Sequence, residues 1–304
     1  MLGVVALLWA TPAQAIVELD SSFGVTDAEY QANAAGFPAV GEFTGNFPDS
    51  GVLVASEWVL TAAHVATSLT NGVSIYAVGG INFTVAQTFI NPSYNATTLE
   101  GDIALVRLTS NVTNVTPAVL YGGSSELGTT AMWVGFGQSG TGITGAGAGR
   151  GTARGATNML DAFYDPTTDT ASQTLGTAII ADFDDGTGFP GGNNTLGEPP
   201  FPLGWSSPTP TTYEGSLAAG DSGGGVFTTI ASTVYLVGVN DFISAGNNGS
   251  STQYGAVMGA TRVSSYVGWI DATSGIPEPG AMAVVIGMAA GVVVIARRGK
   301  KLVS

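Results

Sequence analysis

The chain has 304 residues, with 22 acidic residues against eight basic ones, one histidine and no cysteine. The absence of cysteine excludes disulfide scaffolds and thiol chemistry, and a single histidine excludes a multi-histidine metal centre. The net charge of −14 argues against a nucleic-acid partner, which needs a basic surface, and the 44% of hydrophobic residues exclude a disordered polyanion.

The first 15 residues predict a secretory signal peptide. Residues 2–10 are apolar, and small residues follow at Ala13 and Ala15, as they do before a signal-peptidase cleavage site. No lysine or arginine precedes the apolar run, and a buried N-terminal strand is the alternative interpretation. We expect a signal peptide over residues 1–15, so that the exported chain begins at Ile16.

The middle of the chain predicts an antiparallel β-sandwich or barrel. Short runs rich in Val, Ile, Thr and aromatic residues alternate there with turn residues. One helix is expected over Val263–Ile270, where apolar residues recur at helical spacing, and long loops are expected over Gly137–Gly151 and Asp182–Tyr213. The expected strands are Gly51–Leu60, Val73–Val78, Phe83–Phe89, Ile103–Leu108, Ala131–Phe136, Thr177–Ala181, Gly225–Thr229 and Val234–Val239.

One acidic segment of the second loop offers the ligand type of a metal site. Residues 182–186, Asp-Phe-Asp-Asp-Gly, offer the carboxylate oxygens that calcium takes, but their spacing is not that of an EF-hand loop. A solvated acidic loop is the interpretation that we favour. We expect no metal site and no cofactor.

Three segments bring together the residue types of nucleophilic catalysis. His64 ends one apolar strand, Asp102 stands directly before another, and Ser222 lies in the glycine-rich turn Gly220–Gly224. A serine hydroxyl becomes a nucleophile when a base removes its proton, and histidine titrates in the right range to act as that base. A buried carboxylate holds the imidazole in one tautomer and stabilises the imidazolium.

These segments, in this order, resemble the chymotrypsin/trypsin-like serine peptidases. The resemblance spans roughly residues 16–272 and implies an all-β fold of two packed six-stranded antiparallel β-barrels with a short C-terminal helix, within a peptidase domain over 16–275. The segments that carry it are Trp58–His64, Asn91–Asn95, Gly101–Leu108, Gly135–Gly137, Gly220–Gly224 and Thr261–Ile270.

The resemblance implies a role for each residue of the proposed site. His64 would be the general base, Asp102 the acid that orients it and Ser222 the nucleophile, with the N–H groups of Gly220 and Ser222 forming the oxyanion hole. The chain departs from the family at His64, which is followed by Val65 instead of cysteine. This change concerns stability more than catalysis.

Four residues are expected at the substrate pocket. Ser216 stands six residues before the nucleophile, where trypsin has an acid, so a preference for Arg or Lys is not expected. Phe242 replaces a tryptophan of the family and Ile243 a glycine, which favours small or medium apolar P1 residues, and Leu99 would border the adjoining subsite. The same alignment puts Asp241 where a serine of the family faces the triad acid. A nearby second carboxylate would raise one pKa, so either the alignment shifts by one residue or the site is tuned differently.

An activation pair is also implied. In the trypsin-like family a new N-terminal Ile-Val amine pairs with the acid just before the nucleophile, which here is Asp221. The chain reads Ile16-Val17 after the expected cleavage point. We hypothesise that removal of the signal peptide itself releases this terminus.

The C-terminal tail, residues 276–304, resembles the PEP-CTERM sorting signal of Gram-negative bacteria. Pro277-Glu278-Pro279 is followed by 281–296 without a charge and then by Arg297-Arg298-Gly299-Lys300-Lys301. Sixteen apolar residues form a helix of about 24 Å, enough to span a thin bilayer, and the basic cluster would stay cytoplasmic. The resemblance implies an exosortase-type sorting enzyme as a partner, and export to the inner membrane, the cell surface or the extracellular matrix.

The sequence thus predicts an exported, membrane-anchored bacterial serine endopeptidase with a polypeptide substrate and an acyl-enzyme intermediate. Two alternatives stay open. The first is a catalytically silent surface-binding or matrix protein on the same fold, and the second is an esterase that uses the same triad.

Overall fold

The computed structural model describes residues 15–45, 48–187, 192–197, 206, 208–246 and 249–275. The expected signal peptide, apart from Ala15, and the whole expected sorting tail with its membrane helix at 281–296 lie outside the described residues. Within the described ranges, no helix is long and apolar enough to cross a membrane. The fold is all-β with few helices, as expected.

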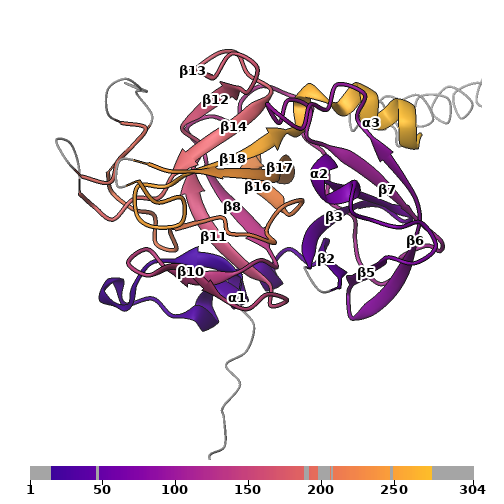
Figure 1. Ribbon diagram of the computed structural model, residues 1–304, viewed down its shortest axis with the longest axis horizontal. Helices are drawn as coiled ribbons and strands as arrows, with labels where there is room; N and C mark the ends of the chain where they lie inside the picture. The colour runs from indigo at the N-terminus through magenta and orange to yellow at the C-terminus, as the bar shows by residue number, and fades with distance from the viewer. Residues whose placement is uncertain are drawn as a thin grey trace, which may run out of the picture.

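The first half of the chain forms a closed six-stranded barrel, drawn in purple in Figure 1. Its strands close in the order β2-β3-β4-β7-β6-β5, and each neighbouring pair is antiparallel. Fully buried β-branched and leucine side chains such as Val52, Leu60 and Leu105 fill its interior. The strands are β2 (Val40–Thr44), β3 (Asp49–Ala55), β4 (Trp58–Thr61), β5 (Ile75–Val78), β6 (Ile81–Ile90) and β7 (Ala104–Leu108).

The second half forms an eight-stranded antiparallel sheet, which corrects the expected six strands. Its order is β11-β8-β16-β17-β18-β14-β12-β13, and the two extra strands are the hairpin β12–β13, which pairs onto β14. The strands are β8 (Thr130–Gly135), β11 (Arg154–Met159), β12 (Ala162–Asp165), β13 (Thr170–Ser172), β14 (Ala178–Asp182), β16 (Gly225–Ile230), β17 (Thr233–Ser244) and β18 (Val257–Arg262).

The barrel and the second sheet lie side by side and share one apolar cluster (Figure 1). Phe37, just before β2, packs its ring 4.7 Å from that of Phe227 on β16. Leu53 of the barrel and Leu236 and Val239 of the sheet are fully buried in the same cluster. Burial of this shared apolar surface fixes how the two halves sit against each other.

A small four-stranded sheet, β10-β9-β1-β15, was not expected. It contains β1 (Ile16–Glu18), β9 (Ser139–Thr141), β10 (Gly145–Ala148) and β15 (Gly215–Ser216). Two of its strands lie in Gly137–Gly151, which composition predicted to be a loop. Glycine suits this pairing because a Cβ on Gly140 would lie 1.8 Å from the Gly145 carbonyl oxygen.

The helices differ from expectation in two places. Helix α1 (Asp27–Ala35) was not predicted, although the Thr26 N–H donates to the Glu29 carboxylate in a capping box. The late helix, expected over Val263–Ile270, instead begins with the 3₁₀ turn η2 (Val263–Ser265) and continues as α3 (Val267–Ser274). The other short helices are η1 (Ser21–Phe23) and α2 (Ala63–Ala66).

Candidate active site

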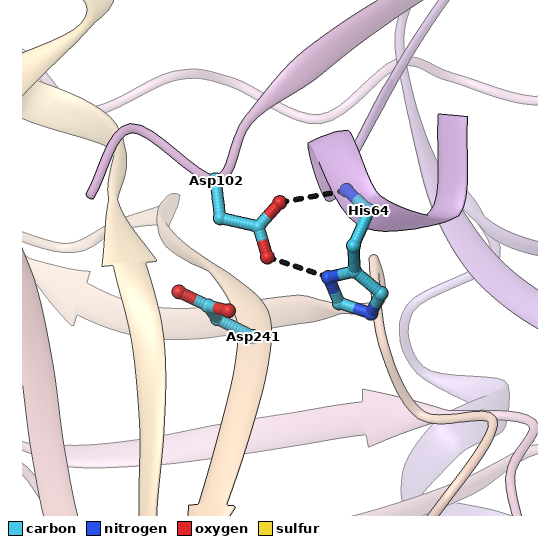
Figure 2. Close-up of side chains that lie close together, drawn as sticks. All are labelled: His64, Asp102 and Asp241. Carbon is cyan, nitrogen blue, oxygen red and sulfur yellow. Dashed lines mark hydrogen bonds and ion pairs between the residues drawn. The ribbon is translucent and has the colours of Figure 1, made fainter. Parts of the chain in front are cut away.

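His64 lies in the short helix α2 (Ala63–Ala66), three residues after β4 ends. The fully buried strand leads into this helix, and the His64 side chain stays 35% exposed. Its Nδ1 is 2.5 Å from Oδ2 of Asp102, and its backbone N–H donates to Oδ1 of the same carboxylate at 2.8 Å (Figure 2). These two contacts fix the imidazole with Nε2 free to face another group.

Asp102 lies two residues before β7 with its side chain fully buried. The Thr261 hydroxyl donates to the Asp102 backbone carbonyl at 3.0 Å, which ties this position to β18 of the second sheet. Burial by itself would raise the pKa of Asp102, but the hydrogen bonds from His64 and Asp241 and the charge of His64 together outweigh burial and lower it. Asp102 is therefore ionised beside the imidazole.

The environment of His64 favours its charged form. Burial would lower the pKa of His64, but the hydrogen bond to Asp102 and the negative charges of Asp102 and Asp49 raise it above its usual value. An imidazole held in this way accepts a proton readily and stays in place when it becomes charged. It has the properties of a general base.

Ser222 lies in a turn that packs against the end of β4. Gly220 and Gly223 adopt positive φ angles of 99° and 81°, which glycine tolerates. A Cβ on Gly223 would lie 2.0 Å from the Thr61 hydroxyl and 3.2 Å from the Ala62 nitrogen. The turn that carries Ser222 therefore touches the residues that lead into His64.

A buried serine that sequence reasoning missed holds this turn. Ser50 on β3 donates its N–H to the Ser222 carbonyl at 2.8 Å and its hydroxyl to the Gly220 carbonyl at 2.9 Å. The same hydroxyl accepts the Phe136 N–H at 2.9 Å, so Ser50 joins the first barrel to the turn. Ser50 sits in an ordinary strand, and no local sequence signal indicates this role.

We expect Gly223→Ala to destabilise the protein and displace the turn. The added methyl would meet the backbone of Ser50 as well as the Thr61 hydroxyl, and an alanine is strained at this φ. The free energy of unfolding should fall by about 2–4 kcal/mol. Chemical denaturation of Gly223→Ala beside Gly24→Ala, a positive-φ glycine with open space around it, checks this. Equal losses in the two variants would show that close packing of the turn has no part in stability.

Asp221 and Ile16 lie together in the structure. The Asp221 carboxylate is fully buried and accepts the N–H groups of Gly137 and Ala218, both at 2.8 Å, and the backbone N–H of Ile16. Burial raises the pKa of Asp221 to about 7, although these hydrogen bonds lower it. Ala15 and Ile16 are themselves fully buried.

The four expected pocket residues lie in three different places. Ser216 is fully buried in β15, where it pairs with Val17 of β1, and Leu99 lies in the turn before Asp102. Phe242 and Ile243 are on β17, and Phe242 lines a cavity of about 160 Å³. Apolar side chains that line this cavity with it are Tyr164, Ala171, Ile180, Leu196, Ala245 and Val257.

Asp182 and Asp184 are buried, so the expected solvated acidic loop is wrong for them. Each is at most 5% exposed, and they form a buried acidic group with Asp161 and Glu214. Burial raises the pKa of Asp182 to about 6, that of Glu214 to about 8 and that of Asp184 to about 11. Asp161 and Glu214 are distant in sequence, and for this reason the group escaped sequence reasoning.

Comparison with known proteins agrees with this arrangement in part of the chain. Residues 27–169 match the family model described as Trypsin. This range contains His64 and Asp102, and Ser222 lies beyond it. The Inactive CLIP domain-containing serine protease A3 of Aedes aegypti is 30% identical over a stretch that covers 35% of this chain and 29% of that protein. The chain thus spans less than a third of this curated relative. The matched range contains all six strands of the closed barrel, so this part of the chain is similar to the Trypsin family.

Proposed function

We propose that the chain is a serine endopeptidase in which Ser222 is the nucleophile, His64 the general base and Asp102 the acid that orients it. The observation that carries the proposal is the His64–Asp102 contact of 2.5 Å, together with the packing of the Ser222 turn on the residues before His64. A histidine held by a buried carboxylate beside a serine turn is the arrangement that activates a hydroxyl.

In the proposed first step, the Ser222 hydroxyl attacks the substrate carbonyl carbon while His64 Nε2 takes its proton. The carbonyl oxygen becomes an oxyanion that accepts the N–H groups of Gly220 and Ser222. His64 then gives the proton to the leaving amine, and the amide bond breaks to leave an acyl-enzyme. Water, deprotonated by His64, attacks the ester, and His64 returns this proton to the Ser222 oxygen as the ester bond breaks and the acid leaves.

We propose that the pocket disfavours Arg and Lys. Ser216 offers no negative charge to a basic P1 side chain, and its hydroxyl is buried without a hydrogen-bond partner among the described residues. Phe242 and Ile243 place apolar surface on β17. Small or medium apolar P1 residues remain our expectation.

We also propose that the chain is exported and that signal-peptide removal precedes folding. In support of this order, both residues that flank the Ala15–Ile16 bond are fully buried, so a protease could not reach the bond in the folded chain. The new Ile16 ammonium would replace the backbone N–H at the Asp221 carboxylate. Anchoring through the 281–296 helix and processing by an exosortase-type enzyme near Pro277 belong to the same proposal.

One observation favours a catalytically silent alternative. The relative from Aedes aegypti is named as an inactive protease. Its name describes that protein, and here histidine, aspartate and serine are all present. An esterase with the same triad is the other alternative.

Cleavage of a peptide library tests the proposal and its alternatives together. A protein that begins at Ile16 should hydrolyse internal peptide bonds after small or medium apolar residues. It should leave peptides intact whose bonds follow only Arg or Lys. Turnover of simple esters without any peptide cleavage would instead indicate an esterase. The absence of both activities would indicate a silent protein.

A further inference from the structure

Asp241 places a second buried carboxyl beside the Asp102–His64 pair. It is 7% exposed and lies on β17, facing the Asp102 carboxylate from the side away from α2 (Figure 2). A ring nitrogen of His64 and one carboxylate oxygen each of Asp102 and Asp241 lie within 4.8 Å of one another. Two ionised carboxylates this close in a buried site would repel each other strongly.

A β-bulge directs Asp241 toward this site. On β17, Asn240 pairs with Ala260 and Phe242 pairs with Gly259, so Asp241 is the extra residue between two consecutive pairs. A bulge of this kind turns a side chain away from the regular alternation and is common beside active sites. The register thus places the carboxyl toward Asp102 while Asn240 holds the Ser222 turn by accepting the Gly223 N–H at 2.8 Å.

The hydrogen bonds of Asp241 leave one oxygen without a donor. Oδ2 lies 3.0 Å from the Thr261 hydroxyl, whose single proton it shares with the Asp102 backbone carbonyl, and Oδ1 is buried without a partner among the described residues. An ionised Oδ1 would be a buried acceptor with no donor, which is costly. A protonated Asp241 carboxyl instead has an acceptor, because the side chains of Asp241 and Asp102 are close enough to share a hydrogen bond.

We propose that Asp241 is a positioning residue of the active site, a neutral carboxylic acid that donates a hydrogen bond to Asp102. Among the described residues, Asp102 then carries the only negative charge in direct contact with His64. This inference rests on the proposed function for its consequence in catalysis. The charge state of Asp241 can be tested in a Ser222→Ala variant, which needs no activity for the measurement.

The surroundings of Asp241 agree with a neutral side chain. Burial, the contact with Asp102 and the charge of Glu100 raise the pKa of Asp241 well above its usual value. Among the described residues, the nearby group that can carry a positive charge is His64, within 4.8 Å, and His64 bonds to Asp102. The titratable and polar groups that face it are Asp102, Glu100 and Tyr94 before β7, His64 on α2 and Thr261 on β18.

A neutral Asp241 has a consequence for the base. A second ionised carboxylate would raise the pKa of His64 further and hold the imidazole protonated, so that it could not accept the Ser222 proton. A neutral donor has the opposite effect, because it stabilises the Asp102 charge and makes Asp102 a weaker partner for the imidazolium. The donor therefore keeps His64 available as a base.

The single histidine of the chain makes the test direct. In a Ser222→Ala background, His64 is the only imidazole, so its titration can be followed by NMR without assignment ambiguity. Asp241→Asn replaces the acid by a neutral amide that can donate to Asp102 and accept from Thr261. We expect the pKa of His64 to change by less than about 0.3 unit.

A fall of about one unit in Asp241→Asn would overturn the proposal, because it would show that an ionised Asp241 had been raising the pKa of His64. Asp49→Asn is the matched control, since the Asp49 charge also raises the pKa of His64 and its removal should lower that pKa measurably. If Asp241→Asn does not fold, Asp241→Ser carries the same test with a neutral hydroxyl donor.

Activity measurements complete the test in the protein that keeps Ser222. Asp241→Asn should keep kcat/KM within about threefold of wild type, whereas Asp241→Ala, which removes the donor, should lose tenfold or more and shift the acidic limb of the pH profile upward. Equal losses in both variants would contradict a role for the donor. A wild-type protein without activity would count against the proposed function alone, because the NMR titration still reports the charge of Asp241.

Discussion

Replacing Ser222 by alanine is expected to lower kcat for peptide hydrolysis by about 10⁴- to 10⁶-fold without unfolding the protein. The hydroxyl is the only group of the proposed mechanism that forms a bond to the substrate. Its turn is held by backbone contacts with Ser50 and Asn240, which alanine leaves in place. Initial rates on the best library peptide, measured beside a denaturation curve, check both parts of the expectation.

Ser124→Ala is the matched control, because Ser124 is exposed and lies far along the chain from the proposed site. It should leave kcat unchanged. His64→Ala should lose activity to a similar extent as Ser222→Ala, and the double variant should lose little more, since the two groups act as a unit. Additive losses, or activity that survives in Ser222→Ala, would contradict the proposed mechanism.

The free energy of unfolding is expected to fall as pH rises from about 5 to 8. Burial raises the pKa of Asp182 to about 6 and that of Glu214 to about 8, and it raises the pKa of Asp184 further still. An unfolded chain releases these protons near pH 4, while the folded chain keeps them. The stabilisation is therefore present at acidic pH and is lost as pH rises, by about 1.4 kcal/mol per pH unit for each retained proton. Urea denaturation at pH 5, 6.5 and 8 measures it.

Asp184→Asn should weaken this pH dependence. Its Oδ1 is buried without a partner among the described residues, so an amide removes the ionisation at little cost in hydrogen bonds. At pH 8 the variant should be more stable than wild type by about 2–4 kcal/mol. Asp165→Asn, at a turn where asparagine can accept the same Thr167 and Thr168 N–H groups, should leave the pH dependence unchanged. Wild-type stability that rises between pH 5 and 8 would contradict this account of the buried acids.

Local sequence patterns predicted the strands of the fold better than its sheets. Runs such as Ile103–Leu108 and Ala131–Phe136 became β7 and β8 within a residue or two because they are apolar, β-rich and bounded by turn residues. Pairing between distant segments left no local trace. The strands β9 and β10 join a sheet through β1, more than 100 residues earlier in the chain, so composition alone predicts a loop over Gly137–Gly151.

The active site likewise has residues that local motifs reveal and residues that only the folded structure reveals. His64 and Asp102 were found because short motifs surround them, and the structure brings them into contact. Asp241 was placed opposite the triad acid by alignment, but its bulge and its unpartnered oxygen appear only in three dimensions. Ser50 and the buried acids Asp161 and Glu214 carry no sequence signal, since their surroundings are assembled from separate strands.

Covalent labelling by a fluorophosphonate tests the central claim, a nucleophilic Ser222 activated by His64, most directly. The reagent should form one adduct on the Ile16-started domain, and peptide mass mapping should place it on Ser222. Labelling should disappear in Ser222→Ala and fall by at least about 10³-fold in rate in His64→Ala. An unlabelled wild-type protein that is folded, or an adduct on another serine, would contradict the claim.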